Sequence, residues 1–101
     1  MTTVKNSPAE CVARLKVLAD ETRLAVMKTL MTFGPLHVGG INHHVPTEQS
    51  LLSHHLKVLR DAGLVVAERD GKAVLYRVAP AVDVSADHSE INLGCCQLSF
   101  A

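Results

Sequence analysis

The chain has 101 residues, of which 48% are hydrophobic and only 3% aromatic, and its formal net charge is zero. That length predicts one domain, and a small apolar-rich chain often buries surplus apolar surface in a dimer. No apolar run could span a bilayer, no secretory signal is visible, and three cysteines make a poor disulfide framework, so we expect a reducing cytoplasm and no membrane partner.

The first predicted helix runs from about residue 8 to residue 19. Ser7 supplies a capping hydroxyl, Pro8 suits the first helical position, and Glu10 completes a capping box. Cys11 falls in the first turn of this helix. The pattern predicts a helix that follows a short unpatterned N-terminus.

A second helix is predicted after Asp20, whose carboxylate can cap it, and Gly34-Pro35 should end it. Its apolar stripe consists of Leu24, Met27, Leu30 and Met31. Residues 36–45 should form the next helix, but Gly39-Gly40 costs about 1 kcal/mol per residue relative to alanine. We therefore expect this third helix to be short or irregular.

The clearest helix signal lies between Thr47, as the N-cap, and Gly63, as the residue after the helix end. One face is apolar and consists of Leu52, Leu56 and Leu59. Another face holds donors without a carboxylate, namely Ser50, Ser53, His54 and Lys57. Such a face can be merely solvated, or it can donate to phosphates and read base edges in a major groove.

Two strands are predicted directly after this helix, at residues 64–69 and 73–78, with Asp70-Gly71 as a tight turn between them. A helix, a glycine and a short hairpin form the order of a winged helix. Basic residues on or near the hairpin are Arg69, Lys72 and Arg77. They can keep an edge strand soluble or hold phosphates beside the groove.

The distribution of charge favours the second interpretation. Residues 54–77 include five basic residues and three acidic ones, whereas after Val78 the only charged residues are Asp83, Asp87 and Glu90. The predicted DNA face is therefore basic and the tail acidic. The expected DNA contacts are Gln49, Ser50, Ser53, His54 and Lys57 on the helix, with Arg69 and Lys72 on the wing.

Two stretches resemble the ArsR/SmtB family of small repressors: SLLSHHLKVLRDAGLV followed by ERDGKAVLYRV, and upstream LKVLADETRLAVMKTL. The resemblance covers residues 9–80 in the right order and spacing. It implies a mainly α winged helix-turn-helix with a β-hairpin wing. It further implies a homodimeric repressor that binds double-stranded operator DNA and releases it when a metal, metalloid or other effector binds.

The resemblance breaks down at two known kinds of metal site. Family members with a Cys-x-Cys pair would place those thiols at His37 and Gly39, and neither position is cysteine. Members that use Asp and His from a C-terminal helix would need a second ligand pair after Asp87 and His88, and none follows. We expect neither site in this chain.

Six histidines invite a metal interpretation. His54 and His55 fall inside the recognition-helix signature, so we expect His54 to point outward and His55 to tuck toward the core. The adjacent His43 and His44 favour a local structural role over a metal site.

The tail, residues 81–101, is expected to be irregular and carries the adjacent Cys95 and Cys96. These cysteines can act as small apolar residues, or as two soft thiolates brought together by a bend at Gly94. With the family resemblance, the second interpretation predicts As(III), or Sb(III), as effector. The third ligand stays open between Cys11, the partner subunit, a small thiol and a residue beyond Ala101.

Three alternatives compete with this hypothesis. The thiols can be redox sensors, either as a Cys95–Cys96 disulfide or as a bridge from Cys11 to the tail, or the winged helix can sense another metal ion. The chain can also be a thiol-rich metal-handling module without DNA, although the donor-rich helix face argues against it. An enzyme is not expected, because no nucleophile triad, phosphate loop or carboxylate pair stands out. We therefore predict one domain over residues 1–101, with a dimerisation helix at about 8–19 and a thiol-bearing tail at about 81–101.

Overall fold

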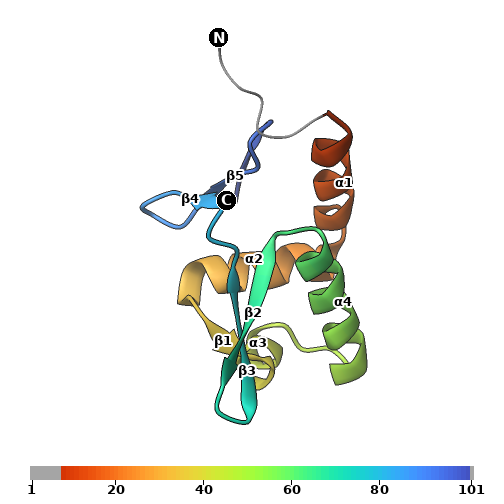
Figure 1. Ribbon diagram of the computed structural model, residues 1–101, viewed down its shortest axis with the longest axis vertical. Coiled ribbons are helices and arrows are strands. Elements are labelled where there is room, and N and C mark those ends of the chain that lie inside the picture. Colours follow the sequence, from red (N-terminus) through yellow and green to blue (C-terminus); the bar gives the residue numbers. More distant parts are fainter. Residues whose placement is uncertain (1–7, 101) are drawn as a thin grey trace.

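The computed structural model describes residues 8–100 (Figure 1). The helices are α1 (Pro8–Leu18), α2 (Glu21–Phe33), α3 (Val38–His44) and α4 (Gln49–Asp61). The strands are β1 (Leu36–His37), β2 (Val65–Asp70), β3 (Ala73–Val78), β4 (Asp83–Val84), β5 (Glu90–Asn92) and β6 (Gln97–Ser99). They form two three-stranded antiparallel sheets, ordered β1-β3-β2 and β4-β5-β6.

The core lies where α2 and α4 meet the base of the wing. Its residues from the two helices are at most 3% exposed and recur at helical spacing: Val26, Met27, Leu30, Met31, Leu52, Leu56 and Leu59. The predicted stripe of α2 is confirmed at three of its four positions, and Leu24 packs on the cluster half-buried. Burial of this apolar surface is the main stabilising contribution.

The ends of α2 are as predicted. The Asp20 carboxylate accepts the backbone N–H of Arg23 at 2.9 Å, and this hydrogen bond lowers the pKa of Asp20. Gly34 follows the helix with a φ of 79° and donates its N–H to Leu30. The predicted cap of α1 at Ser7 lies outside the described residues, and α1 ends one residue before the expected Ala19.

The region expected to be one irregular helix divides into a strand and a helix. Leu36 and His37 form β1 and pair with Tyr76 and Leu75 of β3. Only the seven residues of α3 are helical, so the short helix is confirmed but its predicted start at residue 36 is wrong. Pairing with β3 gives Leu36 and His37 backbone partners outside the helix, whereas both glycines lie within α3.

The helix α4 begins later than predicted. Thr47 is not its N-cap, because Asn42 Nδ2 donates to the Thr47 carbonyl at 2.9 Å and holds this residue in the preceding loop. Glu48 occupies the cap position instead, without a side-chain cap bond. The C-terminal end is as predicted, because Gly63 follows the helix with a φ of 76°.

The wing is a regular hairpin whose turn lies one residue later than predicted. Asp70 pairs with Ala73, so the two turn residues are Gly71 and Lys72. Gly71 has a φ of 63°, which is the conformation that the first position of a type II′ turn requires. This register places Lys72 at the tip of the wing.

The tail was expected to be irregular, and this prediction is wrong. Val84, Ile91 and Leu98 oppose one another across β4, β5 and β6, and Ile91 is fully buried. Strands of two or three residues are too short to give an alternating pattern in the sequence. The loop before β5 is polar, and hydrogen bonds from Ser85 and Ser89 lower the pKa of Asp87 to about 2.

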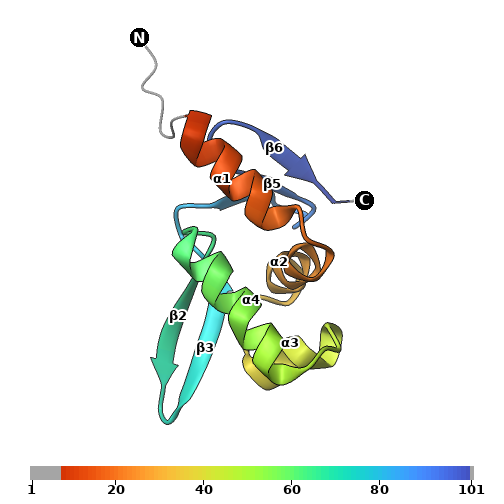
Figure 2. The same ribbon diagram turned by 90° about the vertical axis from the view of Figure 1, so that its right-hand side faces the viewer.

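Two ends of the molecule carry different elements. The start of α4 and the tip of the wing lie at the lower end of the long axis, whereas the start of α1 and the tail lie at the upper end (Figures 1 and 2). None of the helices described over residues 8–100 is long and apolar enough to cross a membrane.

Candidate metal centre and nucleic-acid interface

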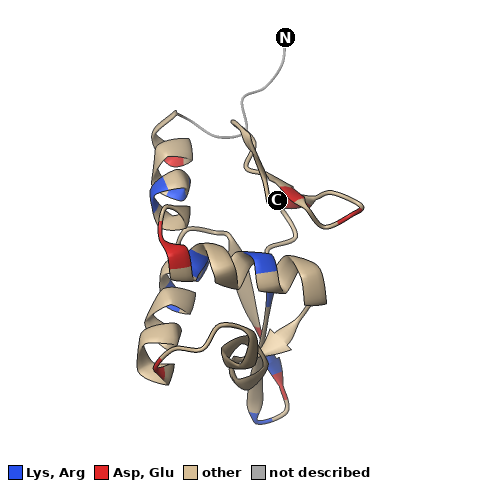
Figure 3. Ribbon diagram, turned by 180° about the vertical axis from the view of Figure 1, so that it is seen from behind, with Lys and Arg blue, Asp and Glu red and all other residues tan. Residues whose placement is uncertain are grey.

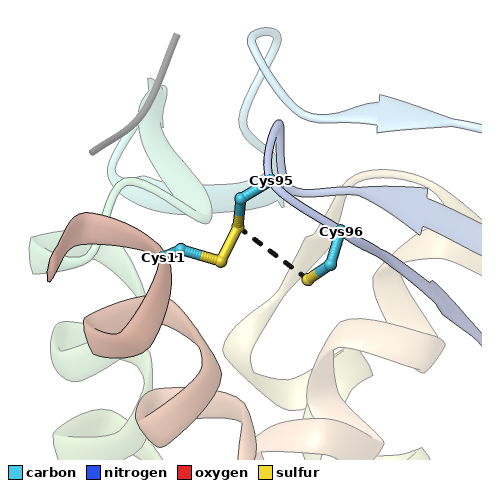
Figure 4. Close-up of side chains that lie close together, drawn as sticks. All are labelled: Cys11, Cys95 and Cys96. Carbon is cyan, nitrogen blue, oxygen red and sulfur yellow. Dashed lines mark hydrogen bonds between the residues drawn. A yellow bond between two sulfur atoms is a disulfide. The ribbon is translucent and has the colours of Figure 1, made fainter. Parts of the chain in front are cut away.

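Three sulfur atoms meet at the upper end of the molecule. The Sγ atoms of Cys11, Cys95 and Cys96 all lie within 4.8 Å of one another. Cys11 and Cys95 form a disulfide, with Cα atoms 6.1 Å apart, and the Cys96 sulfur lies 3.9 Å from that of Cys95 (Figure 4). We call these three residues the thiol cluster. All three belong to one subunit, although Cys11 and Cys95 are 84 positions apart in the sequence.

Local structure explains why the sulfurs converge. Cys11 lies on the buried side of α1, together with Leu18 two turns later. The turn between β5 and β6, residues 93–96, is the thiol loop, and Gly94 within it has a φ of 92°. Leu93 donates its N–H to the Cys96 carbonyl at 2.9 Å and so closes the loop. The tail sheet thereby presents both of its cysteines beside α1.

The donor set of the cluster is purely sulfur. Within residues 8–100, no other group of three or more His, Cys, Asp or Glu side chains has the spacing of a metal site. His44 instead stacks on Phe33, with ring centroids 4.1 Å apart. Asp87 bonds to the neighbouring Ser85 and Ser89 hydroxyls. These contacts give local roles to residues that a histidine or Asp-His site would have used.

The structure adds a residue that the sequence did not single out. Arg14, one turn after Cys11 on α1, donates through Nε to the Ala62 carbonyl and through a terminal nitrogen to the Leu93 carbonyl, both at 3.4 Å. It therefore contacts the end of α4 and the thiol loop together. An arginine three positions from a cysteine has no pattern that would reveal such a role.

Every residue predicted to contact DNA is exposed. Two of them, Arg69 and Lys72, lie on the wing. The other five lie on α4: Gln49, Ser50, Ser53, His54 and Lys57. As predicted, His54 points outward and His55 is buried, 7% exposed. The tail carries only acidic positions, whereas the wing carries basic positions together with acidic ones (Figure 3).

Some of these polar groups already have partners on the surface. Lys57 Nζ lies 2.8 Å from an Asp61 oxygen, and this hydrogen bond lowers the pKa of Asp61. Ser50 donates to Glu48 at 2.6 Å. Because both members of the lysine pair are more than half exposed, the ion pair is weak and a phosphate can replace the carboxylate.

Buried and surface contacts fix the orientation of α4 and the wing. Arg23 on α2 lies 3.1 Å from His55 Nδ1 on α4 and donates to the Val17 carbonyl at 2.6 Å. Since a guanidinium only donates, Nδ1 accepts and His55 carries its proton on Nε2. On the wing, His37 Nε2 lies 2.9 Å from an Asp70 oxygen and ties β1 to the turn.

The helices α3 and α4 with the adjoining hairpin define a winged helix-turn-helix, the class of DNA-binding domain that presents one helix to the major groove. Residues 20–66 match the family described as bacterial regulatory protein, arsR family. The chain is also 38% identical over 92 residues to the transcriptional regulator NmtR of Mycobacterium tuberculosis, covering 85% of this chain and 76% of that protein. The chain therefore belongs to the ArsR/SmtB family of transcriptional regulators.

Two further similar proteins are a repressor named for arsenical resistance and a solved homodimeric domain. The arsenical resistance operon repressor of Escherichia coli is 39% identical over 67 residues, which span 66% of this chain and 57% of the repressor. The homodimeric winged helix-turn-helix domain Mb0332 from Mycobacterium bovis superposes with a TM-score of 0.64 at 26% identity, covering 76% of each chain. These relatives are named as regulators of transcription or as DNA-binding domains, which supports a non-enzymatic role.

Proposed function

We propose that this chain is a repressor that binds operator DNA as a homodimer and releases it when As(III) is held by Cys11, Cys95 and Cys96. The observation that carries the proposal is the convergence of three sulfur atoms within 4.8 Å in one subunit. The likeness to an arsenical resistance repressor supports the choice of effector. The proposal resolves the open third ligand in favour of Cys11.

The donor set suits a thiophilic ion. Soft thiolates bind soft ions in preference to hard ones, and the cluster offers sulfur without oxygen or nitrogen. A thiol reductant that supplies two electrons and two protons would convert the Cys11–Cys95 disulfide into two thiols, which with Cys96 makes three at one place. As(III) favours three sulfur ligands, and Sb(III) shares that preference. Zinc, which usually takes four ligands, would lack one here.

The proposed DNA interface consists of the exposed face of α4 and the wing. Ser53 and His54 would reach base edges, whereas Lys57, Arg69 and Lys72 would hold phosphates. The operator is double-stranded, because a helix can only enter the major groove of a duplex. Two such half-sites lie about 34 Å apart, one helical turn of DNA. Acting on genomic DNA, the repressor would work in the cytoplasm.

The proposed dimer interface includes α1. Val12 and Leu15 remain 49% and 36% exposed on this helix, although large apolar side chains on a small chain usually find cover. Cys11 is buried on the same helix, directly before Val12 and one turn before Leu15. A change in the thiol cluster would therefore shift the helix that sets the spacing of two recognition helices. Allosteric coupling of this kind is typically about 1–3 kcal/mol.

Operator release can be measured by fluorescence anisotropy. A labelled duplex, selected with the wild-type protein from a randomised library, would be titrated under reducing conditions with arsenite, antimonite, zinc or cadmium. We expect arsenite and antimonite to release wild-type protein, and Cys95→Ser/Cys96→Ser and Cys11→Ser proteins to stay bound. Normal release of the double mutant would refute the site, and an absence of DNA binding would refute the repressor.

Mixed dimers test whether Cys11 acts within its own subunit. Subunits with Cys11→Ser would be combined with subunits carrying Cys95→Ser/Cys96→Ser. A site within one subunit leaves both subunits incomplete, so the mixed dimer should not respond to arsenite. A response would instead show that Cys11 reaches across the dimer.

The disulfide favours a second candidate function, thiol-redox sensing. Cys11 and Cys95 would each lose one proton and one electron, and hydrogen peroxide would accept both pairs to give two waters. Peroxide alone, without metalloid, would then release the operator. A wild-type protein that responds to peroxide and not to arsenite would move the function to this alternative.

A further inference from the structure

The basic residue beside the thiol cluster contacts two distant parts of the chain. Arg14 follows Cys11 by three positions, so both side chains lie on the same face of α1. Leu18, one turn further on, is buried on that face as well. The guanidinium is therefore directed into the body of the subunit, and it is half-buried there.

One contact of Arg14 is with the C-terminal end of the recognition helix. Gly63 and Leu64 donate their N–H groups to Arg60 and Leu59, each at 3.0 Å, which is the Schellman pattern that closes a helix. Arg14 Nε donates to the Ala62 carbonyl at this cap. A positive charge here also complements the negative end of the helix dipole.

The other contact is with the thiol loop. A terminal nitrogen of Arg14 donates to the Leu93 carbonyl, and Leu93 in turn donates its N–H to Cys96. Cys95, between them, is bonded to Cys11 on the helix that carries Arg14. Any change in how the two tail cysteines are arranged therefore alters the position of a carbonyl that Arg14 binds.

We propose that Arg14 couples the thiol cluster to the recognition helix by holding the Leu93 and Ala62 carbonyls with one guanidinium. When the Cys11–Cys95 disulfide is reduced and As(III) binds all three sulfurs, the sulfurs of Cys11 and Cys95 move apart, the Leu93 carbonyl moves with the thiol loop, and the Arg14 guanidinium follows it. The Ala62 carbonyl then loses its donor and the cap of α4 loosens. Arg14 is a positioning residue, because it ligates neither the effector nor DNA. This inference rests on the proposed function.

The chemistry of arginine suits this role. Its planar fork presents several donors in fixed directions, so one side chain can hold two carbonyls at a set separation. Lysine carries the same charge on a single nitrogen and cannot reproduce that fork. Charge and bridging geometry can therefore be separated by substitution.

The test compares Arg14→Gln, Arg14→Lys and, as a matched control, Lys16→Gln. Lys16 is exposed on the same helix, so its replacement removes one charge without touching the bridge. For each protein, binding of sodium arsenite is followed by thiolate absorbance, and the dissociation constant for the selected operator duplex is measured with and without arsenite. Thermal unfolding identifies any variant that fails to fold.

In the wild-type and Lys16→Gln proteins, arsenite should weaken operator binding about 5–150-fold. In Arg14→Gln and Arg14→Lys, arsenite should still bind, but the ratio of the two dissociation constants should fall to within about twofold of one. A wild-type ratio in Arg14→Gln would overturn the inference alone. A wild-type ratio in Arg14→Lys would overturn the bridging geometry. A wild-type protein that binds no arsenite would overturn the proposed function, and this inference with it.

Hydrogen exchange keeps the inference testable if the Arg14 variants do not fold. In the wild-type protein, arsenite should speed exchange of the Gly63 and Leu64 amides, because these close the cap of α4, by about threefold or more. Amides in the middle of α2 serve as the reference. Unchanged exchange at the cap in arsenite-loaded protein would contradict the inference.

Discussion

The DNA-facing unit, residues 20–79, and the tail, residues 83–99, are held in place by different means. In the first, side chains from α2, α4 and the wing interlock in a shared core. The tail has strands of two or three residues. Its buried Ile91 and Leu93 join the same core, and a disulfide, a polar loop and Arg14 hold it in addition. A region fixed by packing tolerates chemical change at the surface. The sulfur and hydrogen bonds that supplement packing in the tail are open to such chemistry.

The largest expected effect comes from alanine substitution of one buried residue in each region. Leu56→Ala should lower the free energy of unfolding by about 2–5 kcal/mol, because α4 loses its central core contact. Operator binding should fall as well. Ile91→Ala, an equally buried site in the tail, should weaken arsenite binding while leaving operator affinity within about twofold. Urea unfolding and anisotropy check both. Equal loss of operator binding in the two mutants would mean that the regions are not separable.

Cleavage of the disulfide comes next. A cross-link between residues 84 positions apart restricts almost the whole unfolded chain. Its reduction should therefore lower the free energy of unfolding by roughly 2–4 kcal/mol. The midpoint of thermal unfolding should fall in Cys11→Ser just as in reduced wild-type protein. Cys96→Ser is the control, because it keeps the bond and should behave as oxidised wild type. If reductant left the thermal unfolding midpoint of the wild-type protein unchanged, the disulfide would not stabilise the tail.

A smaller effect concerns phosphate contacts of the wing. Lys72→Ala should weaken binding to every sequence and flatten the slope of log affinity against log salt by about 0.9, the value for one phosphate contact. Lys16→Ala, on α1 far from the wing, should leave the slope unchanged. In contrast, Ser53→Ala should alter the preferred sequence without altering the slope. A steep slope retained in Lys72→Ala would exclude that residue from the interface.

The smallest effect tests the cap of α2. Because the Arg23 N–H lowers the pKa of Asp20 below its ordinary value of 3.8, the cap contributes its stability above about pH 4 and loses it as pH falls through the lowered pKa. Asp20→Ala should cost about 1 kcal/mol near neutral pH. Asp20→Asn caps without titrating, so its denaturant midpoint should vary less between pH 5 and 3. An identical pH profile for aspartate and asparagine would contradict this assignment.

Sequence patterns predicted the DNA-facing unit well because its signals are local. Asp20 and Gly63 mark helix ends by their own backbone chemistry, and the apolar spacing of α4 indicates its buried face. The Thr47 cap failed because a side chain five residues away, Asn42, binds its carbonyl. The tail sheet and the Arg14 bridge join residues up to 79 positions apart, and no local pattern records such pairing. Cys11 was recognised as a candidate ligand, but only the fold brought it to Cys95 and Cys96.

An odd number of cysteines has a consequence for how the chain can be followed in solution. With the disulfide formed, one of the three cysteines, Cys96, keeps a free sulfhydryl. Full reduction would expose three, and a proposed three-sulfur complex would leave none. A maleimide label that reports a mass increment of one, three or zero therefore distinguishes the states in a single spectrum. The number of reactive thiols therefore reports the state of the protein, even in a crude extract and without a DNA-binding assay.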